Sequence, residues 1–305
     1  MKSIWHKLQQ PPDPPPPMPV VVGSPRSGTT LLRLMLDTHP MLAIPPETGF
    51  IPAVQQLNAG PARLREAFFQ QVTSFPPDAP AWNDFQLSAE AFQRALADLR
   101  PFSVAEGCRL FYKMYAARFA KPRWGDKTPL YCRSMAQIEQ LLPEAHFIHI
   151  LRDGRDAAAS LRGYWFSPGA DMVTQAAYWR ENVLAAHAQG SRCSHYLEVF
   201  FEDLVREPEP ALRRICAFIK LDFHADMLRY DRRALQRLAE HGERRRVDGS
   251  LLVSQEARYA QQSAVCRPLD ASKIGSWRMA LRPDEIRAFE QVAGDALRLF
   301  GYPLN

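Results

Sequence analysis

The chain has 305 residues, 46% of them hydrophobic, so it can bury one large core, and we expect a single elaborated domain rather than two separate ones. Its formal net charge of +5 and isoelectric point near 9.0 favour an anionic ligand such as a nucleotide. No apolar stretch approaches the roughly 20 residues of a membrane span, and the first ten residues lack the apolar segment of a signal peptide, so we expect a cytoplasmic protein with no membrane span.

The N-terminal segment is rich in proline. Residues 11–19 read PPDPPPPMP, a composition typical of a stiff, extended polyproline helix. We interpret residues 1–19 as a tail or spacer and expect the folded domain to span residues 20–305. A ligand motif for a partner protein is the alternative interpretation.

A strand, a glycine-containing loop and a helix are predicted next, from the sequence PVVVGSPRSGTT at residues 19–30 and the residues after it. The three valines before Gly23 predict a short buried strand. Apolar residues at helical spacing then predict a helix that stops before Pro40 (Leu31, Leu32, Met35 and Leu36). The loop from Gly23 to Thr30 thus lies at a helix N-terminus, where unpaired backbone N–H groups favour a phosphate.

This loop has the Gly-x4-Gly spacing of a Walker loop, but Thr29 stands where a nucleoside-triphosphate enzyme carries lysine. A loop without that lysine is poorly suited to ATP. Arg26 can instead direct a fork of hydrogen bonds at phosphate or sulfate oxygens, and the hydroxyl groups of Ser27, Thr29 and Thr30 add neutral donors. An ordinary glycine turn is the alternative.

Residues 51–122 carry no binding motif. The sequences PARLREAFFQQV (61–72) and LSAEAFQRALADL (87–99) predict amphipathic helices. We expect a helical insertion that covers either the substrate side of a site or only the core.

A second strand, turn and helix are predicted from HFIHILRDGRDAAASLRGYW at residues 146–165, with the strand at 147–151 and the helix beginning at Ala157. Ligands of open parallel sheets bind beyond the carboxyl ends of the strands. Arg152 and Ser160 are therefore placed to meet the ligand of the first loop. A local ion pair between Arg152 and Asp153 that caps the turn is the alternative.

Two further patterns carry less information. The sequence HGERRRVDGSLLVSQEARYAQQ at 241–262 predicts a mobile, charged loop whose arginines, Arg244 to Arg246, face solvent, with attraction of an anionic acceptor as the alternative. The five cysteines are scattered, with no CxxC pair and no His/Cys cluster at metal spacing. We interpret them as reduced thiols and expect no metal site (Cys108, Cys132, Cys193, Cys216 and Cys266).

Four segments together resemble the sulfotransferases that use 3′-phosphoadenosine 5′-phosphosulfate (PAPS), over nearly the whole chain from about residue 20. They are, in chain order, VVGSPRSGTTLLRLML, WGDKTPLY, HILRDGRDAAASL and KIGSWRMAL. Within that family, the stretch from SPRSGTTLL to PPETGFI is most similar to the tyrosylprotein sulfotransferases and related bacterial enzymes. The resemblance implies a P-loop-like, three-layer α/β/α fold with a central parallel sheet.

The resemblance also implies where PAPS and its product PAP bind. The residues implied for the 5′-phosphosulfate are Arg26, Ser27, Gly28, Thr29 and Thr30, and those implied for the 3′-phosphate are Arg152 and Ser160. In the last segment, Lys273 and the backbone of Gly275 are expected to close over the nucleotide, with Trp277 as a packing anchor. Phe201 departs from the tyrosine that the tyrosylprotein enzymes place on the nucleotide, which weakens any expectation of adenine recognition there.

By the same resemblance, Glu47 is the general base, Lys127 contacts the leaving phosphosulfate oxygen, and Arg26 completes the catalytic set. Considered alone, Glu47 would be interpreted as a cap of the next helix and Lys127 as a surface charge. His39 is the alternative base, because histidine titrates near neutral pH. We expect in-line transfer in which fixed cationic side chains take the place of a metal ion.

The acceptor is left open by the sequence. A hydroxyl group or an amine on a small molecule, carbohydrate, lipid or peptide is compatible with it, whereas nucleic acid is not expected, and a homodimer remains open. A small-molecule kinase and a non-catalytic nucleotide-binding protein are the alternative functions.

Overall fold

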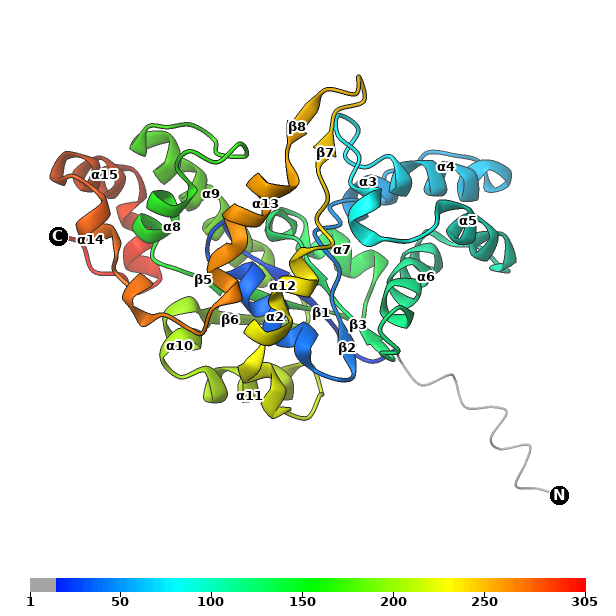
Figure 1. The fold of residues 1–305 in the computed structure, drawn as a ribbon, viewed down its shortest axis with the longest axis horizontal. Helices are drawn as coiled ribbons and strands as arrows, with labels where there is room; N and C mark the ends of the chain where they lie inside the picture. Colours follow the sequence, from blue (N-terminus) through cyan, green and yellow to red (C-terminus); the bar gives the residue numbers. More distant parts are fainter. Residues whose placement is uncertain (1–14) are drawn as a thin grey trace.

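The computed structural model describes residues 15–305. Its centre is a four-stranded parallel sheet with the order β4-β1-β5-β6, of which Figure 1 labels β1, β5 and β6. The strands are β1 (Met18–Val22), β4 (Asp126–Lys127), β5 (Ala145–Leu151) and β6 (Tyr196–Phe200). β1 begins two residues before the predicted strand, and most of the predicted tail, residues 1–14, lies outside the described residues.

Helices cover both faces of this sheet. Val20 and Val22 of β1 belong to one core cluster with α6 (Val104–Ala117) and α7 (Met135–Leu141). Val21 points to the other face and packs with α2 (Thr29–Thr38) and α11 (Pro208–Phe218), because successive side chains of a strand alternate. The predicted three-layer α/β/α arrangement with a central parallel sheet is therefore confirmed.

A third core cluster lies beyond the end of β5, where Leu151 packs among four helices. These helices are α8 (Gly154–Leu161), α9 (Met172–Gly190), α14 (Trp277–Ala280) and α15 (Pro283–Leu299). They form one end of the molecule in Figure 1, and the helical insertion forms the opposite end.

The helical insertion contains the two predicted amphipathic helices. It consists of α3 (Ile51–Gln55), α4 (Pro61–Thr73), the 3₁₀ helix η1 (Trp82–Phe85), α5 (Ala89–Asp98) and α6. Phe68 and Val72 of α4 are buried, as are Phe92 and Leu96 of α5, so both helices turn their apolar face to the core.

Shorter elements complete the chain. They are the paired strands β2 (Leu42–Ala43) and β3 (Arg123–Trp124), the hairpin strands β7 (Arg244–Arg245) and β8 (Leu251–Val253), the helices α10 (Phe201–Arg206), α12 (Asp231–Leu238) and α13 (Gln255–Gln262), and the 3₁₀ helices η2 (Pro129–Arg133), η3 (Ala225–Arg229), η4 (Ser263–Cys266) and η5 (Ala271–Lys273). The loop predicted around Arg244 is thus partly an antiparallel hairpin.

All five cysteines are free. Within residues 15–305, no helix is long and apolar enough to cross a membrane.

The second predicted helix begins three residues early. α8 begins at Gly154 because the Asp153 carboxylate accepts a hydrogen bond from the Arg155 backbone N–H at 2.9 Å and caps the helix. The alternative ion pair between Arg152 and Asp153 is wrong, because Asp153 pairs with Arg155 at 2.8 Å and Arg152 faces Asp156 at 4.0 Å.

Candidate active site

The loop between β1 and α2 depends on two glycines. Gly23 has φ +151°, and a Cβ there would lie 2.5 Å from the carbonyl oxygen of Ile150. Gly28 has φ +98°, and a Cβ there would lie 2.5 Å from the ring of Phe201. The backbone therefore packs closely against β5 and the start of α10 as it enters α2.

The second motif meets this loop, as its placement after the neighbouring strand predicts. Arg26 Nε donates to Ser160 Oγ at 3.0 Å, and one Arg152 guanidinium nitrogen donates to the Arg26 carbonyl at 3.1 Å. The Arg152 guanidinium also lies 4.5 Å from the ring centroid of Phe201. β1 and β5 are adjacent and parallel, so their carboxyl ends bring both arginines to one edge of the sheet.

Burial lowers the pKa of both Arg26 and Arg152 from their ordinary value. Ser27 Oγ and Arg152 Nε are buried and have no hydrogen-bond partner among the described residues. Desolvated cations and unpaired buried donors at a helix N-terminus suit an anionic phosphate group. The residues present here therefore fit the phosphates of a nucleotide.

Lys273 joins this region by its backbone. Its carbonyl accepts a hydrogen bond from Arg152 at 2.9 Å, whereas its side chain is 61% exposed and faces Asp270 at 4.0 Å. The Gly275 backbone N–H donates a hydrogen bond to the Asp156 carboxylate at 2.7 Å. Trp277 is 1% exposed, and its indole N–H donates to Asp153 at 3.1 Å, so the predicted packing anchor is confirmed.

Glu47 and Lys127 are in direct contact. Lys127 Nζ donates to Glu47 Oε1 at 2.6 Å, and the side chains are 2% and 53% exposed, respectively. Burial lowers the pKa of Lys127, and the Glu47 carboxylate acts in the opposite direction. A surface role for Lys127 is therefore wrong. A capping role for Glu47 is also wrong, because α3 begins at Ile51 and has no side-chain cap.

These two side chains line a cavity of about 550 Å³, a size typical of ligand sites. Arg26, Thr29 and Thr30 line the same cavity. His39 lies elsewhere, at the C-terminal end of α2, where its Nε2 donates to the Asp222 carbonyl at 2.9 Å.

Further lining residues were not predicted from sequence. They include Thr48, Phe75, Trp165, Phe166, Tyr178, His241 and Arg258. Arg244 also lines the cavity, and for it the sequence left attraction of an anionic acceptor as the alternative. Within residues 15–305, no group of three or more His, Cys, Asp or Glu side chains is arranged to hold a metal ion.

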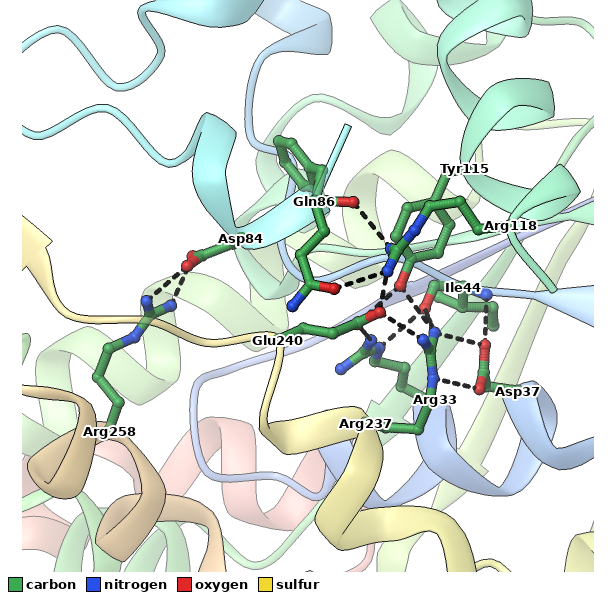
Figure 2. Close-up of polar contacts among 11 residues, drawn as sticks. Arg33, Asp37, Ile44, Asp84, Gln86, Tyr115, Arg118, Arg237, Glu240 and Arg258 are labelled. Carbon is green, nitrogen blue, oxygen red and sulfur yellow. Dashed lines mark hydrogen bonds and ion pairs between the residues drawn. The ribbon is translucent and has the colours of Figure 1, made fainter. Parts of the chain in front are cut away.

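Two of these arginines are held by Asp84 of η1. Arg258 donates to both Asp84 carboxylate oxygens at 2.7 and 2.6 Å (Figure 2), and Arg244 contacts the same group at 3.3 Å. Arg244 is 16% exposed at its side chain, so the prediction that it faces solvent is wrong. Arg245 and Arg246 are exposed, as predicted.

A buried ion network supports the neighbouring wall of the cavity (Figure 2). Arg237 of α12 donates to Asp37 of α2 at 2.7 Å and to Glu240 at 2.6 Å, and Glu240 accepts from Tyr115 of α6 at 2.8 Å. The network fixes Glu240 and therefore the next residue, His241. Burial and nearby cations, Arg258 foremost, lower the pKa of His241 well below its ordinary value, so this imidazole is neutral.

Comparison with known proteins agrees with this geometry. The profile of a family described as "Sulfotransferase family" matches residues 17–225. Protein-tyrosine sulfotransferase A of Caenorhabditis elegans is 23% identical over 302 residues, which cover 95% of this chain and 68% of the relative. The protein-tyrosine sulfotransferase of Drosophila melanogaster is 24% identical over 300 residues, which cover 94% of this chain and 52% of the relative. The chain thus spans about half to two thirds of the length of these curated relatives.

Two solved structures share the fold. The sulfotransferase domain from the curacin biosynthetic pathway has a TM-score of 0.57 and 20% identity, and covers 96% of this chain and 100% of that domain. The sulfotransferase domain of the Synechococcus PCC 7002 olefin synthase has a TM-score of 0.55 and 22% identity, and covers 97% of this chain and 99% of that domain.

Proposed function

The chain belongs to the sulfotransferase family of PAPS-dependent enzymes, and on this basis we propose that Glu47, Lys127 and Arg26 carry out sulfuryl transfer to an acceptor hydroxyl group. Family membership decides against the kinase and the non-catalytic alternatives. The observation that carries the residue assignment is the 2.6 Å contact between Lys127 and Glu47, in a cavity that also holds Arg26 at the N-terminus of α2.

PAPS supplies the sulfuryl group, and the protein residues have three tasks. Glu47 accepts the proton of the acceptor hydroxyl as its oxygen bonds to sulfur. Lys127 donates a hydrogen bond to the oxygen that leaves with the phosphate, where negative charge accumulates. Arg26 and the backbone N–H groups at the start of α2 hold the 5′-phosphate, while Arg152 is assigned to the 3′-phosphate. In this proposal the acceptor oxygen attacks sulfur in line with the leaving oxygen.

For the acceptor we propose a hydroxyl group on a protein or peptide. The relatives named protein-tyrosine sulfotransferases support this choice. The aromatic side chains of Phe75, Trp165, Phe166 and Tyr178 in the cavity wall also support it, because such a wall suits a phenol ring. Transfer from labelled PAPS to tyrosine peptides, carbohydrates, lipids and small alcohols would identify the class. A product formed only on a non-peptide acceptor would contradict this part of the proposal.

The Glu47→Gln variant tests the base. Glutamine keeps the size of the side chain but cannot accept a proton at neutral pH, so we expect turnover to fall by about 10² to 10⁴. PAP affinity by calorimetry should stay near that of the parent. The melting temperature should fall, because the buried Lys127 loses its charged partner, but the transition should stay cooperative and show that the variant is folded. Glu66→Gln, on the exposed face of α4, is the matched control and should keep parental turnover. Parental turnover in Glu47→Gln would eliminate Glu47 as the base.

A further inference from the structure

A buried cluster of hydroxyl groups around one carboxylate lies directly behind the Glu47–Lys127 pair. Its members are Thr48, Tyr112, Asp126 and Tyr131, each 2% exposed or less. Asp126 Oδ2 accepts hydrogen bonds from Thr48 Oγ1 at 2.6 Å and from the Tyr112 hydroxyl at 2.8 Å. Thr48 Oγ1 also contacts the Tyr131 hydroxyl at 2.8 Å. We refer to these four residues as the Asp126 cluster.

The direction of the hydrogen bonds in the Asp126 cluster is fixed. Thr48 has one hydroxyl proton and directs it to the carboxylate, so Tyr131 must donate its own proton to Thr48. The Tyr131 oxygen in turn accepts from the Ile51 backbone N–H at 3.0 Å. The chain of donors therefore runs from the start of α3 to Asp126, and Thr48 occupies its middle.

The cluster and the catalytic pair are built from the same two dipeptides. Glu47 contacts Lys127 at 2.6 Å, and the following residue, Thr48, contacts the residue before Lys127, Asp126, also at 2.6 Å. The Thr48 backbone N–H donates to Thr128 Oγ1 at 3.1 Å. Because the Glu47 side chain is 53% exposed, its position depends on the backbone that Thr48 anchors.

Stability alone does not account for a carboxylate at this place. Burial raises the pKa of Asp126, and Asp126 Oδ1 has no hydrogen-bond partner among the described residues. A buried carboxylate with an unpaired oxygen costs free energy that an apolar side chain would not cost. Alignment of the neighbouring Glu47 and Lys127 side chains would account for the presence of the cluster.

We propose that Thr48 is a positioning residue, which acts through its hydrogen bonds to Asp126 and Tyr131 to hold the Glu47 carboxylate in reach of the acceptor hydroxyl. This inference rests on the proposed role of Glu47 as the base. Misplacement of a reacting group by about 1 Å can cost around 10²-fold in rate. Loss of the Thr48 hydroxyl should therefore lower kcat without affecting the nucleotide site.

The test is a double-variant cycle on the full chain. Thr48→Val should lower kcat by about 10- to 100-fold with PAP affinity unchanged, and Thr48→Ser, which keeps the hydroxyl, should restore most of the turnover. In a Glu47→Gln background, Thr48→Val should change the residual rate by less than about 3-fold, because there is no base left to position. Thr38→Val is the matched control. Its buried hydroxyl donates to the Leu34 carbonyl at 2.8 Å, at the opposite end of α2 from the residues that line the cavity, and its loss should leave kcat unchanged.

Two outcomes would overturn the inference while leaving the proposed function intact: parental kcat in Thr48→Val, or an equal loss with and without Glu47. Parental turnover in Glu47→Gln would instead refute the proposed role of Glu47 as the base. If Thr48→Val does not fold, Tyr131→Phe removes the donor to Thr48 and should show the same dependence on Glu47. Equal losses in both backgrounds would then refute the inference.

Discussion

Replacing Arg152 with methionine tests the proposed site for the nucleotide's 3′-phosphate. Arg152 is 8% exposed and stacks on Phe201, and its guanidinium group donates to the carbonyls of Arg26 and Lys273. Methionine keeps the unbranched apolar stem over the aromatic ring but removes the charge and the donors. The change therefore separates packing from anion recognition.

The expected loss follows from the contact that would disappear. A hydrogen bond between a guanidinium and a phosphate contributes roughly 1.5 to 3 kcal/mol. At 1.36 kcal/mol for each power of ten, PAP binding should weaken by about 10- to 150-fold. Adenosine 5′-monophosphate lacks the 3′-phosphate, so its affinity should change by less than about 3-fold.

Calorimetry with both nucleotides measures this difference directly. Arg180→Met is the matched control, because Arg180 lies on the surface of α9, 41% exposed, and pairs with Asp295 at 2.6 Å. Its affinities should equal those of the parent. Far-UV circular dichroism and a cooperative melting transition establish that each variant is folded. If Arg152→Met lost no more affinity for PAP than for the monophosphate, the assignment of the 3′-phosphate to Arg152 would be refuted.

Two further predictions concern stability. Burial lowers the pKa of His149 from 6.5 to about 4, so below pH 6.5 the unfolded chain binds a proton that the folded chain binds only near pH 4. Between pH 7 and pH 4, the free energy of unfolding of the parent should therefore fall by up to roughly 3 kcal/mol relative to that of His149→Gln. Urea unfolding at each pH measures this difference, and a difference that does not change with pH would contradict the prediction. Gly28→Ala should lower the melting temperature and weaken PAP binding, because its Cβ would meet Phe201 at 2.5 Å with φ at +98°. Gly60→Ala, whose Cβ would meet nothing within 4 Å, should do neither.

The sequence predicted those parts of the site whose structure depends on residues close together in the chain. The valines before Gly23 and the apolar residues after Thr30 specify a strand and a helix by their own periodicity, and the position of the loop at a helix N-terminus follows from them. Strand adjacency in a parallel sheet was then enough to predict that Arg152 meets this loop.

Side-chain partners were decided only by the tertiary structure. Arg258 pairs with Asp84, which lies 174 positions away in the chain. No local sequence pattern predicts a contact between residues so far apart. Lys273 was predicted to close over the nucleotide, but only the packing of η5 decides that its carbonyl group contacts Arg152 while its side chain is exposed. Such choices depend on which backbone segments come together and on which way each side chain then points.

The sequence by itself determined two strand–turn–helix units, two amphipathic helices and a glycine-containing loop at a helix N-terminus, because these depend on residues near one another in the chain. Only the tertiary structure decided that Lys127 is buried against Glu47, 80 positions away, rather than exposed at the surface. The free energy of a charged group is set by its surroundings, through desolvation and the charges nearby, and those surroundings exist only once the chain has folded.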